Sequence, residues 1–153
     1  MKKLITILLL SALLINLSIS TSALSDENGT VIYLHETGTK DGYIIIDKVI
    51  LHPQLTRTNT RTATHSKTVY REGILIAEIA YTATFRYDGT TVSVVTKAVT
   101  QTDTYNGWNY KQQSFTSSGG TVTLEAKLTK LLILSSSFTM HLSCDTDGNI
   151  TIA

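Results

Sequence analysis

Alternating threonine and basic side chains are the first candidate for chemistry in this chain of 153 residues. Between Pro53 and Arg71 no residue is acidic. If the segment is extended, successive side chains point to opposite faces, so hydroxyls fall on one face and cations on the other. The threonines are Thr56, Thr58, Thr60, Thr62 and Thr64, and the cations are Arg57, Arg61, Lys67 and Arg71. We call this segment the Thr/Arg ribbon.

Two chemistries suit the Thr/Arg ribbon. A hydroxyl row can hydrogen-bond sugars or ordered water, and guanidinium groups match the phosphates and carboxylates of anionic wall polymers. The alternative is a solvated hairpin or edge strand, on which charge prevents edge-to-edge pairing. We take Arg57, Arg61, Lys67 and Arg71, with Thr58, Thr60 and Thr62, as candidate binding residues.

Three aromatic residues form a second candidate surface. Tyr105, Trp108 and Tyr110 surround the dipeptide Asn106-Gly107, and Trp108 is the one tryptophan of the chain. Exposed aromatic rings on a loop can stack on sugars or anchor a protein partner. The alternative is that these rings close the rim of the core.

The acidic and histidine residues predict neither a metal site nor a catalytic site. Asp145, Asp147 and Asn149 alternate as oxygen ligands would, but the spacing departs from that of a calcium loop, and an Asp-Gly hairpin explains it. The histidines are isolated from one another, whereas a zinc site needs three or four converging ligands. No nucleophile elbow or phosphate-binding glycine loop is present. We therefore expect a protein that is not an enzyme and needs no cofactor. The histidines are His35, His52, His65 and His141.

The N-terminal segment has the layout of a secretory signal peptide. Lys2 and Lys3 precede an apolar run, and small and polar residues follow up to Ala23. The run is too short to span a bilayer comfortably, which takes about 20 residues. We expect residues 1–23 to be removed and residues 24–153 to form one secreted domain with no stable membrane anchor. An uncleaved N-terminal anchor is the alternative.

Composition narrows the class of protein further. A hydrophobic fraction of 42% with a single proline argues against disorder. A net charge of +1 gives no reason to expect nucleic acid as a partner. The single cysteine, Cys144, excludes an intrachain disulfide framework.

Downstream of the expected leader, turn dipeptides separate segments in which apolar residues alternate with polar ones. This period of two predicts β-strands, and Asn-Gly or Asp-Gly dipeptides suit type I′ hairpins. One inward set is predicted to run from Leu75 to Tyr87, a second comprises Val92, Val94, Thr96 and Ala98, and others include Val122 to Leu128 and Phe138 to Cys144.

Strands with one apolar face must be covered by a second sheet or close on themselves. We therefore predict an all-β, antiparallel β-sandwich, with a small antiparallel barrel as the alternative. By its parity, Cys144 faces the core as a small hydrophobe; pairing between chains is the other reading.

Two segments carry a resemblance to a family. Together with the leader, Tyr81–Gly89 and Leu142–Ile150 resemble small secreted all-β proteins of Gram-positive bacteria, an uncharacterised group. The resemblance implies a bacterial, extracellular origin and no particular activity.

The sequence thus predicts a secreted, non-catalytic binding module at the cell envelope or in the extracellular space. Its expected partners are a cell-wall polymer, a glycan or a surface protein, and the sequence leaves its oligomeric state open. Two alternatives belong to other classes. A toxin or pore former would use strands with one apolar face as membrane hairpins. A small extracellular hydrolase would bring carboxylates or a Ser–His pair together.

Overall fold

The strands predicted from alternation are present in a computed structural model of the chain, which describes residues 25–26, 29–39, 41–54, 59–131 and 133–152. The expected leader, residues 1–23, lies outside the described residues, and so do Arg57 and Thr58. The described strands are β1 (Ser25–Asp26), β2 (Gly29–Gly38), β3 (Tyr43–Leu51), β4 (Thr60–Arg71), β5 (Ile74–Tyr87), β6 (Val92–Thr104), β7 (Asn109–Ser118), β8 (Thr121–Lys130), β9 (Leu134–Cys144) and β10 (Ile150–Thr151).

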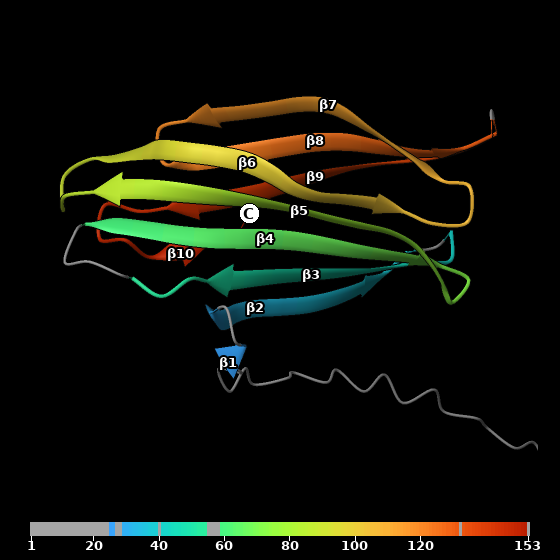
Figure 1. Cartoon of the computed structure of the whole chain (residues 1–153), viewed down its shortest axis with the longest axis horizontal. Helices are drawn as coiled ribbons and strands as arrows, with labels where there is room; N and C mark the ends of the chain where they lie inside the picture. Colours follow the sequence, from blue (N-terminus) through green and yellow to red (C-terminus); the bar gives the residue numbers. More distant parts are fainter. Residues whose placement is uncertain (1–24, 27–28, 40, 55–58, 132, 153) are drawn as a thin grey trace, which may run out of the picture.

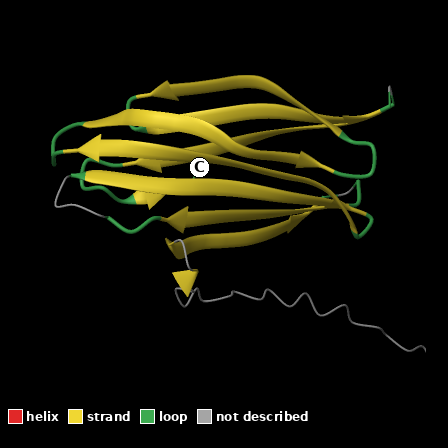
Figure 2. Cartoon of the chain, viewed as in Figure 1, coloured by secondary structure: helices red, strands yellow, loops and turns green. Residues whose placement is uncertain are grey.

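These strands form two antiparallel sheets in simple chain order. One sheet has the order β1-β2-β3-β4-β5-β6, and the other has the order β10-β9-β8-β7 (Figure 1). The described part of the chain is all strand and loop (Figure 2). The described residues therefore include no helix that could span a membrane. The all-β, antiparallel prediction is confirmed, and the two sheets face each other in a sandwich-like arrangement.

The core lies between the two sheets. Tyr81 and Phe85 of β5 and Leu124 of β8 are completely buried, and Phe138 of β9 packs half-buried against them. The Tyr81 hydroxyl donates a hydrogen bond across the core to the Val122 carbonyl oxygen at 3.4 Å. Because apolar residues occupy every second position, each strand has one face for this shared interior.

Two β-bulges overturn part of the predicted inward set. In β5, Val69 of β4 pairs with Ala77 and Tyr70 pairs with Leu75, so the extra residue between them, Ile76, points inward with 2% exposure. Leu75 therefore faces outward beside Tyr70, and its predicted inward position is wrong. A bulge places two residues opposite one, and all alternation on one side of it is reversed.

The second bulge lies in β6. Phe85 pairs with Val94 and Thr84 pairs with Thr96, which leaves Val95 as the extra residue. Thr96 and Ala98 consequently face solvent, contrary to prediction, and Lys97 turns toward the interior. Its ammonium group donates a hydrogen bond of 2.9 Å to the Phe115 carbonyl oxygen.

Candidate functional site

Hairpin turns gather at both ends of the sandwich, and one end is hollowed. The turns β2–β3, β4–β5, β6–β7 and β8–β9 lie at the end drawn on the right of Figure 1. The last three border a cavity of about 360 Å³. Its lining residues are Arg71, Glu72, Ile74, Ile76, Asn106, Trp108, Lys130 and Leu134. We call it the end cavity.

Backbone conformation marks the same three turns. Among the described residues, the non-glycine residues with positive φ are Glu72 (51°), Asn106 (56°) and Leu131 (54°), one in each turn. Glu72-Gly73 and Asn106-Gly107 have positive φ at both positions, as a type I′ turn requires, because Gly73 and Gly107 lie at 78° and 77°. Backbone conformations that side chains disfavour tend to cluster where a structure has a function.

Trp108 forms a wall of the end cavity. It is 4% exposed, and its ring meets Tyr43 edge-on at 6.3 Å between centroids. The guanidinium carbon of Arg71 lies 5.4 Å from the centre of the Tyr43 ring, on the neighbouring strand. Tyr43 therefore supports both residues, and two predicted binding residues from separate candidate surfaces meet in one place.

The Arg71 guanidinium has an N–H group that is not used in a hydrogen bond to the described residues. Its Nε atom is buried and has no hydrogen-bond partner within the described part of the chain. The Glu72 carboxylate is 3.9 Å away and its side chain is 75% exposed, so this ion pair is loose and solvent-screened. Buried donors are nearly always satisfied by protein or ligand. Lys130 adds a second cation to the lining.

The β6–β7 turn is pinned by its polar side chains. The Asn106 side-chain amide donates to the Leu75 carbonyl oxygen at 2.9 Å, and the Tyr105 hydroxyl donates to Glu78 Oε2 at 2.6 Å. The bond to the carboxylate raises the pKa of Tyr105 to about 12. Tyr105 thus braces the turn from outside, whereas Trp108 faces the end cavity.

Tyr110, the third aromatic residue, lies away from that lining. Its ring is half-buried and packs against the core, as the alternative for this residue predicted. Burial raises the pKa of its hydroxyl, whose oxygen has no hydrogen-bond partner among the described residues.

The Thr/Arg ribbon does not form one basic surface. Within β4, its odd-numbered residues from Arg61 to Lys67 face the interior: Arg61 pairs with the buried Phe85, and Lys67 is only 8% exposed. Arg61 and Arg71 lie at opposite ends of β4, roughly 33 Å apart at the usual rise per residue. The expectation of a continuous cationic face is therefore wrong, because the alternation turns that face toward the core.

Lys67 belongs instead to a buried polar cluster. Its ammonium group contacts Asp47 Oδ1 at 2.8 Å and Oδ2 at 3.0 Å, and His65 Nε2 lies 3.1 Å from Oδ1. Burial raises the pKa of Asp47, but the hydrogen bonds from His65 and Lys67 outweigh it, so the pKa falls below its usual value. Sequence analysis treated these residues separately; only the register of β3 against β4 brings them together.

The described hydroxyls of the Thr/Arg ribbon lie on the opposite face of β4, and two of them already bond to threonines of β5. Thr62 Oγ1 lies 3.0 Å from Thr84 Oγ1, and Thr64 Oγ1 lies 2.7 Å from Thr82 Oγ1. Thr60 begins the same face, opposite Arg86. These lateral bonds stabilise the pairing of β4 with β5, so this face is a weaker candidate for binding than the end cavity.

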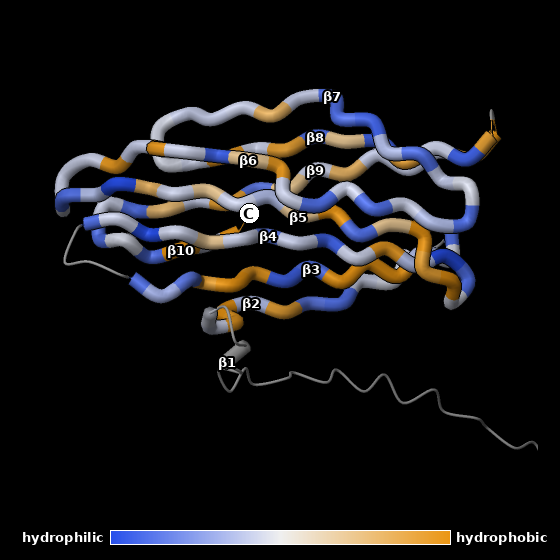
Figure 3. The backbone as a smooth tube through the Cα atoms, in the orientation of Figure 1, coloured by the Kyte–Doolittle hydropathy of each residue, from blue (hydrophilic) through white to orange (hydrophobic). Residues whose placement is uncertain are grey.

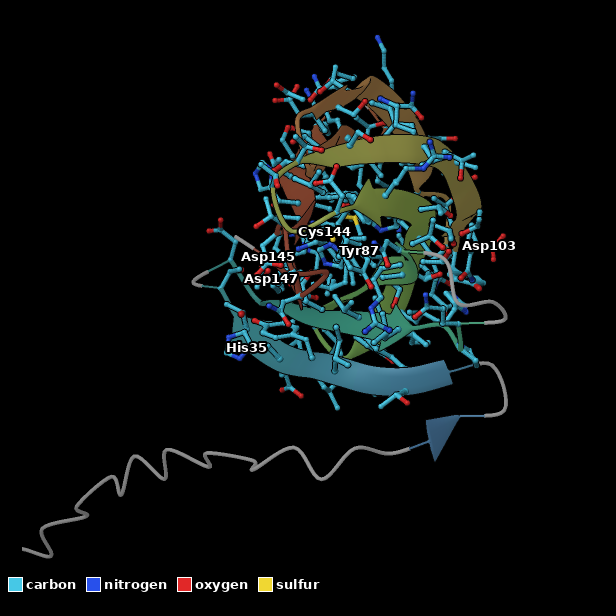
Figure 4. The ribbon with its side chains drawn as sticks, turned by 90° about the vertical axis from the view of Figure 1, so that its left-hand side faces the viewer. His35, Tyr87, Asp103, Cys144, Asp145 and Asp147 are labelled. Carbon is cyan, nitrogen blue, oxygen red and sulfur yellow. The ribbon has the colours of Figure 1, made fainter. Side chains whose placement is uncertain are left out.

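Asp145 organises the loop at the opposite end. Its Oδ1 accepts hydrogen bonds from the backbone N–H groups of Asp147 (2.9 Å) and Asn149 (2.8 Å), and these bonds lower its pKa together with one from the Asn149 side chain, the largest cause. Figure 4 labels this loop beside Cys144 and Tyr87. Only Gly148 has positive φ here, so the loop is an Asp-capped turn rather than the predicted type I′ hairpin. The described residues contain no group of three potential metal ligands drawn from His, Cys, Asp and Glu.

Cys144 lies in the interior, as its parity predicted. The side chain is buried, and its Sγ atom lies 3.4 Å from the Asp145 carbonyl oxygen. Burial, with the nearby Asp145 charge, raises the pKa of the thiol to about 11. The thiol is therefore protonated near neutral pH.

Sequence analysis missed Lys130 and Leu134 in the lining of the end cavity. They flank the β8–β9 turn, far along the chain from Arg71 and Trp108.

A scan against family models and searches of curated proteins and solved structures found no match to the chain. The resemblance to secreted proteins of Gram-positive bacteria stays a prediction.

Proposed function

We propose that the protein is a secreted, non-catalytic binding module whose end cavity holds the anionic group of a small polar ligand, such as a sugar phosphate or a uronic acid. The meeting of Arg71, Lys130 and Trp108 around one cavity carries this proposal. Guanidinium groups bind phosphate and carboxylate oxygens through parallel hydrogen bonds, and an aromatic wall suits the face of a sugar ring.

The size and polarity of the end cavity support a small ligand. About 360 Å³ lies within the range of small-molecule sites. The lining pairs an apolar wall with a few polar groups that can fix orientation. Among the described residues that line it, Glu72 is the single carboxylate, whereas glycoside hydrolysis generally uses two carboxyl groups, so this lining favours binding over hydrolysis.

Trp108 makes the proposal directly testable, because a lone tryptophan reports on this cavity alone. The described strands all lie downstream of residue 24, so the experiment uses residues 24–153, the expected secreted chain. Trp108 emission is followed during titration with glucose 1-phosphate, and with glucose as the uncharged match. We expect a saturable change with glucose 1-phosphate and at least tenfold weaker binding of glucose.

Arg71→Gln removes the proposed anion-binding group. A hydrogen bond to a charged group contributes about 1.5–3 kcal/mol, so we expect roughly 10- to 100-fold weaker binding. Arg86→Gln is the matched control, because Arg86 is exposed on the outer face of β5. The proposal fails if neither probe saturates, if glucose binds as tightly, or if Arg71→Gln binds like the parent chain.

A further inference from the structure

Aliphatic side chains protrude from two turns that border the end cavity. Ile74, the first residue of β5 after the β4–β5 turn, is 56% exposed, and Leu131 and Ile133 of the β8–β9 turn are 77% and 84% exposed. Figure 3 shows hydrophobic colour at both turns at this end of the molecule. We call these three residues the apolar tips.

The exposure of the apolar tips is built into the local backbone. Leu131 has a φ of 54°, a region that residues other than glycine, asparagine and aspartate seldom occupy. Lys130 precedes it and Leu134 follows the turn, and both line the end cavity. At this turn Leu131 is thus exposed, at a conformational cost, while Lys130 and Leu134 line the end cavity.

We propose that the anionic group held in the end cavity is the headgroup of an anionic phospholipid, and that the apolar tips enter the hydrocarbon beside it. This inference rests on the proposed function. Cations at headgroup level with aliphatic side chains reaching deeper match the layered chemistry of a lipid surface. Arg71 and Lys130 of the lining supply the cations.

Lipid suits the apolar tips better than a protein partner does. Protein interfaces bury broad, closely packed areas enriched in aromatic residues and arginine. Here the three most exposed large hydrophobic residues of the described chain, Ile74, Leu131 and Ile133, are all aliphatic and lie at two separate turns beside the end cavity. Single aliphatic residues on turns can enter a bilayer without a complementary surface, because lipid chains adapt to their shape.

Vesicle sedimentation tests the inference with residues 24–153. The vesicles are phosphatidylcholine alone or phosphatidylcholine mixed with phosphatidylglycerol. We expect the protein to sediment with the mixed vesicles and at least tenfold less with phosphatidylcholine. The double variant Leu131→Ser/Ile133→Ser should bind the mixed vesicles about tenfold or more weakly, because neither position then has an aliphatic side chain to bury in the bilayer. Leu34→Ser is the matched control, since Leu34 is 48% exposed in the middle of β2, and it should bind like the parent chain.

The outcomes separate this inference from the proposed function. Saturable binding of glucose 1-phosphate without sedimentation overturns the lipid assignment and leaves the proposed function intact; a protein partner for the apolar tips would give this result. Sedimentation unchanged in the double variant also overturns the assignment. If Arg71→Gln sediments with the mixed vesicles as the parent chain does, and glucose 1-phosphate does not bind, the end cavity does not bind an anion. This result refutes both proposals.

Discussion

Removing the Asp47 carboxylate should leave the buried Lys67 charge without its counterion. The Lys67 ammonium lies 2.8 Å from Asp47 Oδ1, and the two side chains are 10% and 16% exposed. At an effective dielectric constant of about 20, charges ~3 Å apart attract by roughly 6 kcal/mol, and desolvation of both groups cancels much of this. Losing one partner of a buried pair costs about 3–5 kcal/mol. Because some solvent reaches both groups, we expect about 3 kcal/mol for Asp47→Ala.

Urea unfolding monitored by circular dichroism measures this change in the free energy of unfolding. The double variant Asp47→Asn/Lys67→Met removes both charges and keeps an acceptor for His65, so it should recover most of the loss. Asp103→Ala, which removes an exposed carboxylate from β6, should change stability by less than about 0.5 kcal/mol. A loss below about 1 kcal/mol for Asp47→Ala, or a double variant as unstable as the single one, would refute the reasoning.

The same pair fixes the direction of one pH effect. The folded-state pKa of Asp47 lies below its usual value, so its contribution is fully present above the unfolded pKa of about 3.9. As the pH falls through the folded pKa, protonation removes that contribution. We expect the stability difference between the parent chain and Asp47→Ala to shrink below about pH 4. A difference that stays constant down to the acid-unfolded state would contradict this linkage.

Three further predictions concern the core and the β9–β10 loop. Phe85→Ala should cost about 3–5 kcal/mol in urea unfolding because the ring is completely buried; a loss under 1 kcal/mol would place Phe85 outside the core. With its pKa raised to about 11, the Cys144 thiol should react slowly with a disulfide reagent at neutral pH and rapidly in urea, and equal rates would contradict its burial. Gly148→Ala should lower the free energy of unfolding by about 2 kcal/mol or more, because φ is 85° and a Cβ would collide with the Tyr87 ring. An unchanged unfolding midpoint would show that the loop accommodates the added Cβ.

Periodicity predicted the strands well because burial acts on every second residue. The alternation from Val122 to Leu128 is reproduced in the burial of β8. The bulges at Ile76 and Val95 escaped prediction. In each case two apolar residues are adjacent, and only pairing with the neighbouring strand decides which one points inward.

The end cavity could be predicted only in pieces. The turn chemistry of Asn106-Gly107 and the presence of Trp108 are local signals, and both were recognised. Their proximity to Arg71 and Lys130 depends on sheet order, which a single sequence does not encode in any local pattern. The prediction for the Thr/Arg ribbon was wrong for a related reason. Alternation divides the side chains between two faces but does not say which face is exposed, and in β4 the face that carries the cations points toward the core.

Backbone amide shifts provide the most direct test of the central claim that the end cavity binds an anionic group. Nitrogen-15-labelled protein is titrated with glucose 1-phosphate, and each N–H resonance is followed. The account predicts the largest changes at the Trp108 indole and at Gly73 and Gly107, whose turns border the cavity. Changes centred instead on Thr62 and Thr64 would contradict it, because they would move binding to the hydroxyl face of β4.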